Sequence, residues 1–169
     1  MINLAKYIDH TLLKPDATAT QIETLCSEAL KFDFKAVCVN SSHLKLVKKQ
    51  LDGHKVKIAT VIGFPLGAMS TESKIFEAKD AILNGADEID MVLNIGWLKS
   101  GATELVAAEI AQIKDIIGNK VLKVILETCY LSTQEKELAC DLVVKAGADF
   151  VKTSTGFGTG GATFEDVKL

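Results

Sequence analysis

Short runs rich in valine, isoleucine and leucine alternate along this chain with longer segments of helical period, and this alternation limits the available folds most strongly. Such a pattern is typical of βαβ units that build a parallel sheet covered by helices. Apolar residues at steps of three and four predict the helices, each with one stripe to pack on the sheet. The apolar runs predict six strands, over residues 7–10, 36–39, 57–62, 88–93, 122–127 and 150–152.

The composition favours one globular α/β domain over residues 1–169. Of the 169 residues, 48% are hydrophobic, which is enough to bury a substantial core. No linker or low-complexity stretch divides the chain. The formal net charge is -3, with acids and bases interspersed, so the chain lacks the basic surface that nucleic acid requires. A small molecule is therefore the expected partner, and we expect none among nucleic acids.

The cysteines and the first residues are typical of a cytoplasmic protein. The four cysteines contain no Cys-x-x-Cys pair, which suits reduced thiols. The opening segment MINLAKYIDH has no apolar signal core. No apolar stretch approaches the ~20 residues that span a bilayer, so no membrane partner is expected. The three histidines form no ligand cluster, and we predict no metal.

One repeated phrase brings charged residues into two of the apolar runs. GADEID at residues 85–90 recurs as GADFVK at residues 147–152, and each phrase ends in a charged residue five positions after its glycine. In a closed parallel barrel, alternate strands contribute side chains to the same interior layer. The repeat therefore predicts that the Asp90 carboxylate and the Lys152 amine meet. Lys123, within LKVILET, adds another cation inside an apolar run.

Two interpretations of Lys152 remain open, because lysine is almost never buried without a partner. In the first, Lys152 ends its strand and either extends to water or simply pairs with Asp90. In the second, desolvation and the neighbouring Lys123 lower the pKa of Lys152 toward ~7 to 8, where a neutral amine is available. Such an amine attacks a carbonyl to form a Schiff base, and Asp90 would then move the protons.

The segment TSTGFGTGG that follows Lys152 formally matches Gly-x-Gly-x-x-Gly at Gly156, Gly158 and Gly161. A dinucleotide site also needs an acidic residue ~20 positions later, after a second strand, so we do not predict one. Backbone amides that approach an anion, a mobile lid and a plain flexible connection all remain possible interpretations of the glycines.

Polar residues also stand at the ends of the first two predicted strands, where active-site groups gather in α/β barrels. In YIDHTLLKPDAT, the alternative is a turn in which Asp16 or Thr18 caps the next helix. A buried cysteine such as Cys38 is usually only a small hydrophobe. The residues that we predict to contact substrate are Asp9, Thr11, Cys38, Asn40, Thr153 and Gly156.

The phrases IDHTLLKP, VCVN, VIGFPLG, GADEIDMVLNIG, LKVILETC and GADFVKTSTGFGTGGAT together closely resemble the 2-deoxyribose-5-phosphate aldolase family over essentially the entire chain. The resemblance implies a (β/α)8 TIM barrel and a class I aldolase, an enzyme that cleaves 2-deoxy-D-ribose 5-phosphate to D-glyceraldehyde 3-phosphate and acetaldehyde. It implies no metal and no organic cofactor. It further implies Schiff-base formation at Lys152, proton transfer by Asp90, and a pocket-lining position for Lys123, Asp9 and Thr11.

The chain departs from that family in its length. Family members continue through strands seven and eight, and an eight-stranded barrel takes ~250 residues, or at least ~200. We therefore expect an incomplete barrel of about six of the eight units. The resemblance implies that the missing part carries a second lysine, on strand seven, and most of the phosphate site.

Open strand edges in such a chain favour association, so we expect a homo-oligomer. The alternative to an active aldolase is therefore a catalytically impaired barrel fragment that self-associates through its open edges. A third interpretation is an open doubly wound domain that binds a phosphorylated ligand, since six parallel strands suit that fold as well. Strand order separates the two folds, because a barrel keeps sequential neighbours throughout.

Overall fold

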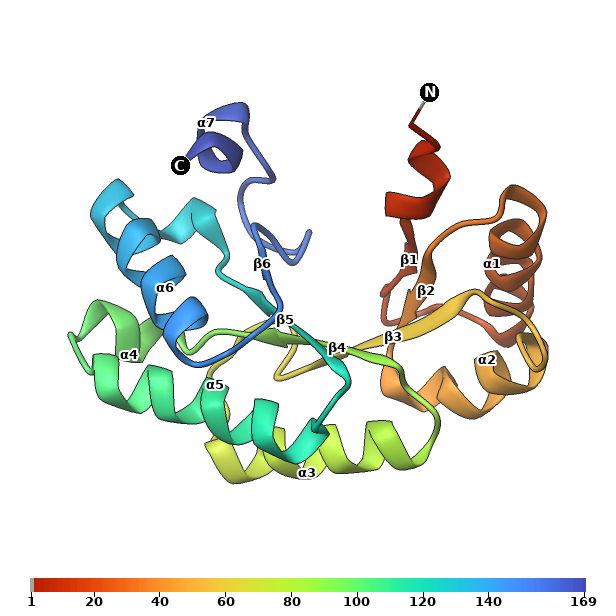
Figure 1. Cartoon of the computed structure of the whole chain (residues 1–169), viewed down its shortest axis with the longest axis horizontal. Helices are drawn as coiled ribbons and strands as arrows, with labels where there is room; N and C mark the ends of the chain where they lie inside the picture. Colours follow the sequence, from red (N-terminus) through yellow and green to blue (C-terminus); the bar gives the residue numbers. More distant parts are fainter. Residues whose placement is uncertain (1) are drawn as a thin grey trace. The chain divides into compact units, whose positions relative to one another are not determined.

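The computed structural model describes residues 2–169 (Figure 1). These residues divide into two compact units. The first unit comprises the residues up to Val61 together with Asp80–Ile89. The second comprises Ile62–Lys79 and Asp90–Leu169. Within residues 2–169, no helix is both long and apolar enough to cross a membrane.

Six strands are hydrogen-bonded as neighbours in the order β1-β2-β3-β4-β5-β6. The β1/β2, β2/β3 and β5/β6 ladders are parallel. An order without reversal is the one that a barrel predicts, and it contradicts the doubly wound alternative, in which the order reverses at a switch point. The strands are β1 Asp9–Leu12, β2 Ala36–Val39, β3 Lys57–Ile62, β4 Glu88–Val92, β5 Val121–Ile125 and β6 Phe150–Lys152.

Three predicted strands have the observed bounds, and three require correction. The predicted strand at 7–10 lies at Asp9–Leu12, because Leu4–Tyr7 forms a 3-10 helix (η1) that Asn3 caps. The strand predicted to end at residue 127 is Val121–Ile125, because Glu127 has a left-handed backbone that an extended strand cannot continue. The strand predicted for 88–93 ends one residue earlier, at Val92.

The first unit contains α1 (Ala19–Phe32), the 3-10 helix η2 (Ser41–His43) and α2 (Leu44–Gln50). Thr18 caps α1 in a capping box with Gln21, as one of the two predicted caps. All four residues of β2 are buried. The α1 stripe that is buried with them consists of Ile22, Leu25, Cys26 and Ala29.

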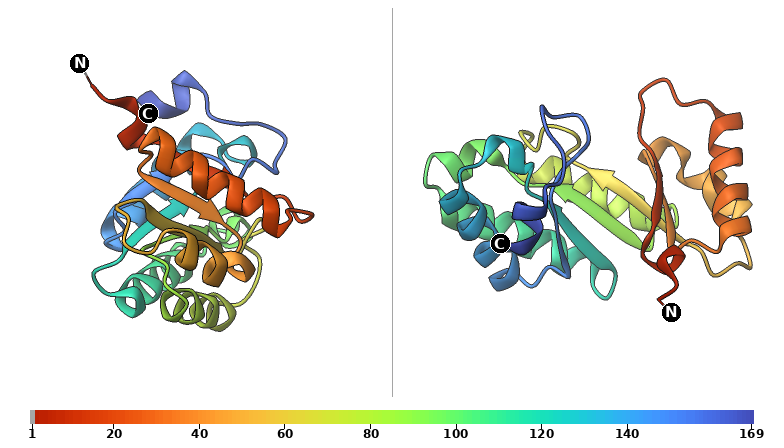
Figure 2. Two further views of the ribbon diagram at one scale, coloured as in Figure 1. Left: turned by 90° about the vertical axis from the view of Figure 1, so that its right-hand side faces the viewer. Right: turned by 90° about the horizontal axis from the view of Figure 1, so that it is seen from above.

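The second unit holds the helices that follow β4 and β5. The predicted capping box of Ser132 with Glu135 begins α6, and α5 packs against both β5 and α6 (Figures 1 and 2). The buried stripe of α5 contains Val106, Ile110, Ile113 and Ile117, as its period predicted. The remaining elements are α4 Ile95–Lys99, α5 Thr103–Ile117, η3 Thr128–Tyr130, α6 Thr133–Lys145 and α7 Phe164–Lys168, while α3 covers Thr71–Leu83.

Candidate active site

Asp90, Lys123 and Lys152 form one charged cluster within the second unit. Asp90 Oδ1 accepts a hydrogen bond from Lys123 Nζ at 3.0 Å, and Asp90 Oδ2 accepts one from Lys152 Nζ at 2.7 Å. The structure thus brings together the carboxylate and the amine that the repeated phrase predicted to meet. It also places the predicted second cation on the same carboxylate.

Strand register explains why the two lysines share a face. In the β5/β6 ladder, Lys123 pairs with Phe150 and Ile125 pairs with Lys152. Side chains two residues apart on a strand point to the same face, so Lys123 and Lys152 point to one face from adjacent positions. On β4 the residues of opposite parity, Ile89 and Met91, are fully buried, as their apolar character predicted.

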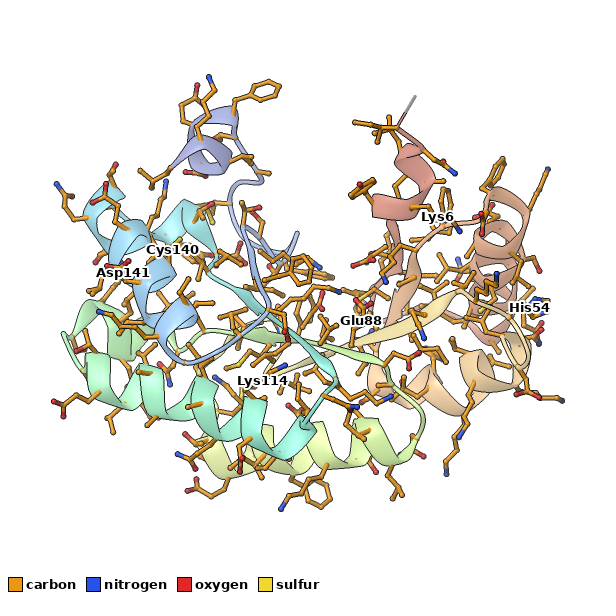
Figure 3. The ribbon with its side chains drawn as sticks, viewed as in Figure 1. Lys6, His54, Glu88, Lys114, Cys140 and Asp141 are labelled. Atoms are coloured by element: carbon orange, nitrogen blue, oxygen red, sulfur yellow. The ribbon has the colours of Figure 1, made fainter. Side chains whose placement is uncertain are left out.

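The aspartates inside the repeated phrase anchor the strands that carry the cluster. Asp149 Oδ2 accepts hydrogen bonds from the Leu122 amide at 2.8 Å and from Lys114 Nζ at 2.7 Å (Lys114 is labelled in Figure 3). In the first unit, Asp87 Oδ2 accepts from the Ile58 amide at 3.3 Å in the same manner. Each GAD phrase therefore ties the start of its own strand to the start of the preceding one.

Burial differs sharply across the cluster. The Asp90 side chain is 0% exposed, that of Lys123 is 11% exposed, and that of Lys152 is 32% exposed. The carboxylate is therefore shielded from solvent, whereas the Lys152 side chain is partly exposed. If both lysines were protonated, two positive charges would face one negative charge, which suits an anionic substrate.

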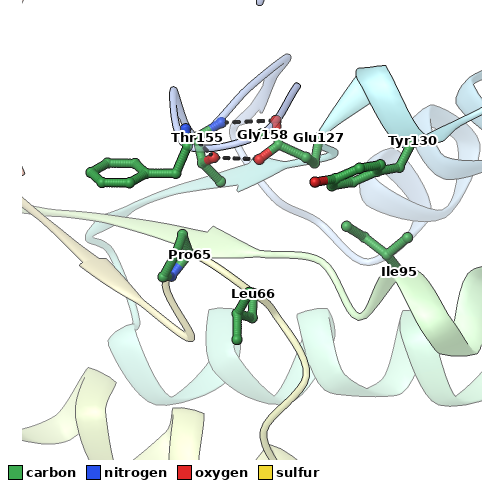
Figure 4. Close-up of a pocket in the computed structure, with 8 residues that line it drawn as sticks. Pro65, Leu66, Ile95, Glu127, Tyr130, Thr155 and Gly158 are labelled. Atoms are coloured by element: carbon green, nitrogen blue, oxygen red, sulfur yellow. Dashed lines mark hydrogen bonds between the residues drawn. The ribbon is translucent and has the colours of Figure 1, made fainter. Parts of the chain in front are cut away.

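A second polar group lies at the carboxyl ends of β5 and β6, and sequence reasoning missed its central residue, Glu127. Glu127 is 2% exposed, and its carboxylate accepts hydrogen bonds from the Thr155 amide, at 3.2 Å, and from Thr155 Oγ1 (Figure 4). Both residues line a pocket of about 300 Å³ that opens to solvent. Its other lining residues are Pro65, Leu66, Ile95, Tyr130, Phe157 and Gly158.

Two predicted substrate contacts, Thr153 and Gly156, flank Thr155 in the segment that follows Lys152. The Thr153 carbonyl accepts from the Thr128 amide at 2.9 Å, and Thr153 Oγ1 accepts from Ser154 Oγ at 3.2 Å. Gly156 has φ 84° and no neighbouring atom within 4 Å of an added Cβ. The backbone conformation, rather than a lack of space, therefore requires glycine at this position.

The other four predicted substrate contacts belong to the first unit. Thr11 Oγ1 donates to the Asp9 carbonyl at 2.8 Å, and Asn40 Nδ2 donates to the Leu13 carbonyl at 3.1 Å. Cys38 is fully buried, in register with Thr11. Contact of all six residues with a substrate remains a prediction.

A buried ion pair that the sequence did not reveal lies behind β4. Lys74 Nζ donates to Glu109 Oε2 at 2.7 Å and to the Val92 carbonyl at 3.0 Å, and both charged side chains are buried. Thr71 Oγ1 also donates to Glu109 Oε1, at 3.2 Å. Burial lowers the pKa of Lys74 and raises the pKa of Glu109, and the attraction between the two groups opposes both shifts.

Within residues 2–169, no group of three or more His, Cys, Asp or Glu side chains is placed to hold a metal ion. Two of the histidines, His54 and His10, lie apart from any such group. His54 lies on an exposed turn (Figure 3), and His10 Nε2 contacts Glu28 Oε2 at 2.7 Å.

Comparison with known proteins relates this chain to aldolases. A family model described as "DeoC/LacD family aldolase" matches residues 3–168. A curated relative from Finegoldia magna, named deoxyribose-phosphate aldolase, is 61% identical over 168 residues, which cover 99% of this chain and 79% of the relative.

Solved structures agree with this relation. The chain titled "QR15, an Aldolase" is 42% identical with a TM-score of 0.95, and the match covers 99% of this chain and 75% of that one. A tetrameric deoxyribose phosphate aldolase from Aeropyrum pernix is 35% identical with a TM-score of 0.82, over 92% of this chain and 66% of that one. These similarities confirm the predicted fold class, an incomplete (β/α)8-type barrel. This chain spans about two thirds to four fifths of the relatives' lengths.

Proposed function

Because the chain belongs to the DeoC/LacD aldolase family, as its sequence phrases predicted, we propose that it cleaves 2-deoxy-D-ribose 5-phosphate through a lysine Schiff base. The products would be D-glyceraldehyde 3-phosphate and acetaldehyde. The name of the 61% identical relative supports this substrate. The observation that carries the proposal is the 2.7 Å contact between Lys152 Nζ and the buried Asp90 carboxylate, beside Lys123.

Lys152 is the nucleophile in this mechanism. Its neutral amine attacks the aldehyde carbon of the open-chain sugar, and the carbinolamine loses water to give an iminium ion. The iminium draws the electron pair of the bond between the second and third carbons, while the hydroxyl of the third carbon loses its proton. Glyceraldehyde 3-phosphate leaves, and the remaining enamine of acetaldehyde is protonated and hydrolysed.

Asp90 is placed to move the protons of these steps. Its carboxylate contacts Lys152 Nζ directly, so it can exchange a proton with the amine or with a water beside it. Two lysines share this single carboxylate, so the one negative charge of Asp90 balances only one of the two positive charges that protonated lysines would carry. The Schiff base itself supplies the electron sink, so the proposal includes no metal or organic cofactor.

Borohydride trapping tests the proposal. Acetaldehyde followed by borohydride should leave a stable adduct on Lys152, located by peptide mass spectrometry. Lys152→Arg should abolish the adduct, whereas Lys145→Arg, which changes an exposed lysine of α6, should retain it. Asp90→Asn should lower the cleavage rate by about a hundredfold or more. Failure of the protein to form an adduct on Lys152 would contradict the Schiff-base mechanism.

We further propose that the protein acts as a cytoplasmic homo-oligomer. The Aeropyrum pernix relative is described as tetrameric. Phe150 and Val151 of β6 are 56% and 41% exposed, which leaves apolar surface for a partner copy. Light scattering should show a species larger than the 18.2 kDa chain, and a compact stable monomer would contradict the proposal. Cell fractionation tests the location.

A further inference from the structure

The proposed chemistry leaves the buried carboxylate of Glu127 without a role. Glu127 has φ 55° and ψ 63°, a left-handed conformation that costs roughly 1 to 2 kcal/mol for most residues with a Cβ. Burial of its charge is unfavourable as well unless hydrogen bonds compensate for it. Two unfavourable features at one residue of a pocket wall are typical of a functional position.

Thr155 compensates for the buried charge and connects it to the loop after Lys152. The Thr155 amide and hydroxyl both donate to the Glu127 carboxylate, and the same hydroxyl accepts from the Phe157 amide at 2.9 Å. An added Cβ at Gly158 would lie 3.0 Å from Glu127 Cδ, so the loop backbone rests directly against this carboxylate. The loop Thr155–Gly158 is therefore anchored on one side chain.

The backbone beside Glu127 holds the proposed nucleophile as well. The Leu126 amide donates to the Lys152 carbonyl at 2.9 Å, and the Thr128 amide donates to the Thr153 carbonyl at 2.9 Å. Glu127 lies between these two donors in the sequence. Its backbone is left-handed, so β5 does not continue through it, and its carboxylate binds Thr155. One segment thus sets both the main chain of Lys152 and the loop that follows it.

The backbone amides of the loop Thr155–Gly158 alternate between those that donate to protein atoms and those that do not. The Thr155 and Phe157 amides donate inward, to Glu127 and to Thr155 Oγ1. Within residues 2–169, the Gly156 and Gly158 amides donate to no protein acceptor. These two amides are therefore available to the oxygen atoms of a ligand.

We propose that Glu127 is a positioning residue that holds the loop Thr155–Gly158 in the conformation that receives the phosphate-bearing end of the substrate. The inference rests on the proposed function for the identity of that substrate. Glu127 does not touch the reacting carbons of the substrate. It acts through Thr155, so its loss should weaken binding of the sugar phosphate without disturbing imine formation at Lys152.

The test compares binding with imine formation in Glu127→Gln, which keeps the shape and removes the charge. The probe is 2-deoxyribitol 5-phosphate, which has no aldehyde and binds without forming a Schiff base. Its Kd, measured by calorimetry, should rise about fivefold, since the Thr155 amide and hydroxyl donate to different oxygens of the carboxylate, and glutamine offers one neutral oxygen and an NH2 group that cannot accept. The rate of acetaldehyde trapping on Lys152 should change less than about twofold, because the Asp90 contact is untouched.

Matched variants distinguish loss of the Glu127–Thr155 contact from a general loss of structure. Thr155→Val should raise the Kd as Glu127→Gln does, whereas Thr155→Ser keeps the hydroxyl and should leave the Kd near that of the unsubstituted protein. Glu137→Gln, at an exposed position of α6, should change neither readout.

An unchanged Kd in both Glu127→Gln and Thr155→Val would overturn the inference. An equal loss of binding and trapping would overturn it too, because that result indicates general damage. Lack of any binding of the analogue by the unsubstituted protein would refute the loop's role as a substrate site. Lack of trapping on Lys152 would instead refute the proposed Schiff-base function, and the binding comparison would still test Glu127.

Discussion

Replacing Lys74 with methionine should lower the free energy of unfolding by about 3 to 5 kcal/mol, the usual cost of breaking a buried ion pair from one side. Methionine has a similar length, but it removes the bonds to Glu109 Oε2, at 2.7 Å, and to the Val92 carbonyl, at 3.0 Å. Glu109 then keeps the bond from Thr71 Oγ1 and loses its cation. Because a domain is stable by only about 5 to 15 kcal/mol, the loss should be large.

The loss of unfolding free energy in Lys74→Met should depend on pH, because the substitution leaves Glu109 without its cation. Burial raises the pKa of Glu109 above its ordinary value of 4.5, and Lys74 opposes that rise. Without Lys74 the pKa of Glu109 rises further, so the folded variant holds a proton that the unfolded chain has released. The contribution of Glu109 to the variant's stability is therefore greatest below pH 4.5 and falls as pH rises through the folded pKa. We expect a smaller deficit at pH 5 than at pH 8.

Urea unfolding, followed by circular dichroism at both pH values, measures these differences. Lys74→Met combined with Glu109→Leu should recover more than half of the loss, since an apolar pair of similar volume often replaces a buried ion pair without cost. Lys79→Met, on the exposed side of α3, should change stability by less than about 0.5 kcal/mol. A loss below about 1 kcal/mol in Lys74→Met, or additive losses in the double variant, would refute the reasoning.

Two further predictions concern backbone strain and thiol burial. Gly67→Ala should destabilise the protein by several kcal/mol more than Gly101→Ala. Both glycines have positive φ. However, an added Cβ at Gly67 would lie 2.1 Å from the Leu93 carbonyl oxygen, whereas one at Gly101 would meet nothing within 4 Å. Thermal unfolding compares them, and equal losses would contradict the steric argument. Burial raises the pKa of the Cys26 thiol to about 11, so alkylation at pH 8 should spare Cys26 until urea unfolds the chain. Rapid labelling of the folded protein would contradict that expectation.

Element type followed from the sequence because apolar runs and helical stripes report directly on which residues the core buries. The ranges of β2, β3 and β6 matched for this reason. The bounds of β1 and β5 did not match the prediction, because they depend on local backbone conformations that the pattern of apolar residues does not encode. A capped 3-10 turn precedes β1, and the left-handed Glu127 follows β5.

The charged cluster was predictable where the sequence repeats itself and where a lysine, Lys123, interrupts an apolar run. Asp90 and Lys152 occupy equivalent positions of two GAD phrases, so strand geometry alone placed them together. Lys74 gave no such signal, because a helical lysine normally lies on a solvated face and its partner Glu109 is 35 residues away. Glu127 was visible as an acid near a strand end, but its contact with Thr155 depends on a backbone conformation that no residue pattern specifies.

Two buried charged residues that the sequence did not reveal, Lys74 and Glu127, bind segments of the chain next to the predicted cluster. Lys74 holds the carbonyl of Val92, two residues after Asp90, and the Leu93 amide donates to the Ile125 carbonyl at 3.0 Å. Glu127, two residues after Ile125, holds the loop that leaves Lys152. Apolar side chains pack without fixed direction, whereas a charged hydrogen bond fixes both distance and orientation. Buried charge next to the ends of β4 and β5 therefore costs stability but fixes the main chain from which the proposed catalytic side chains extend.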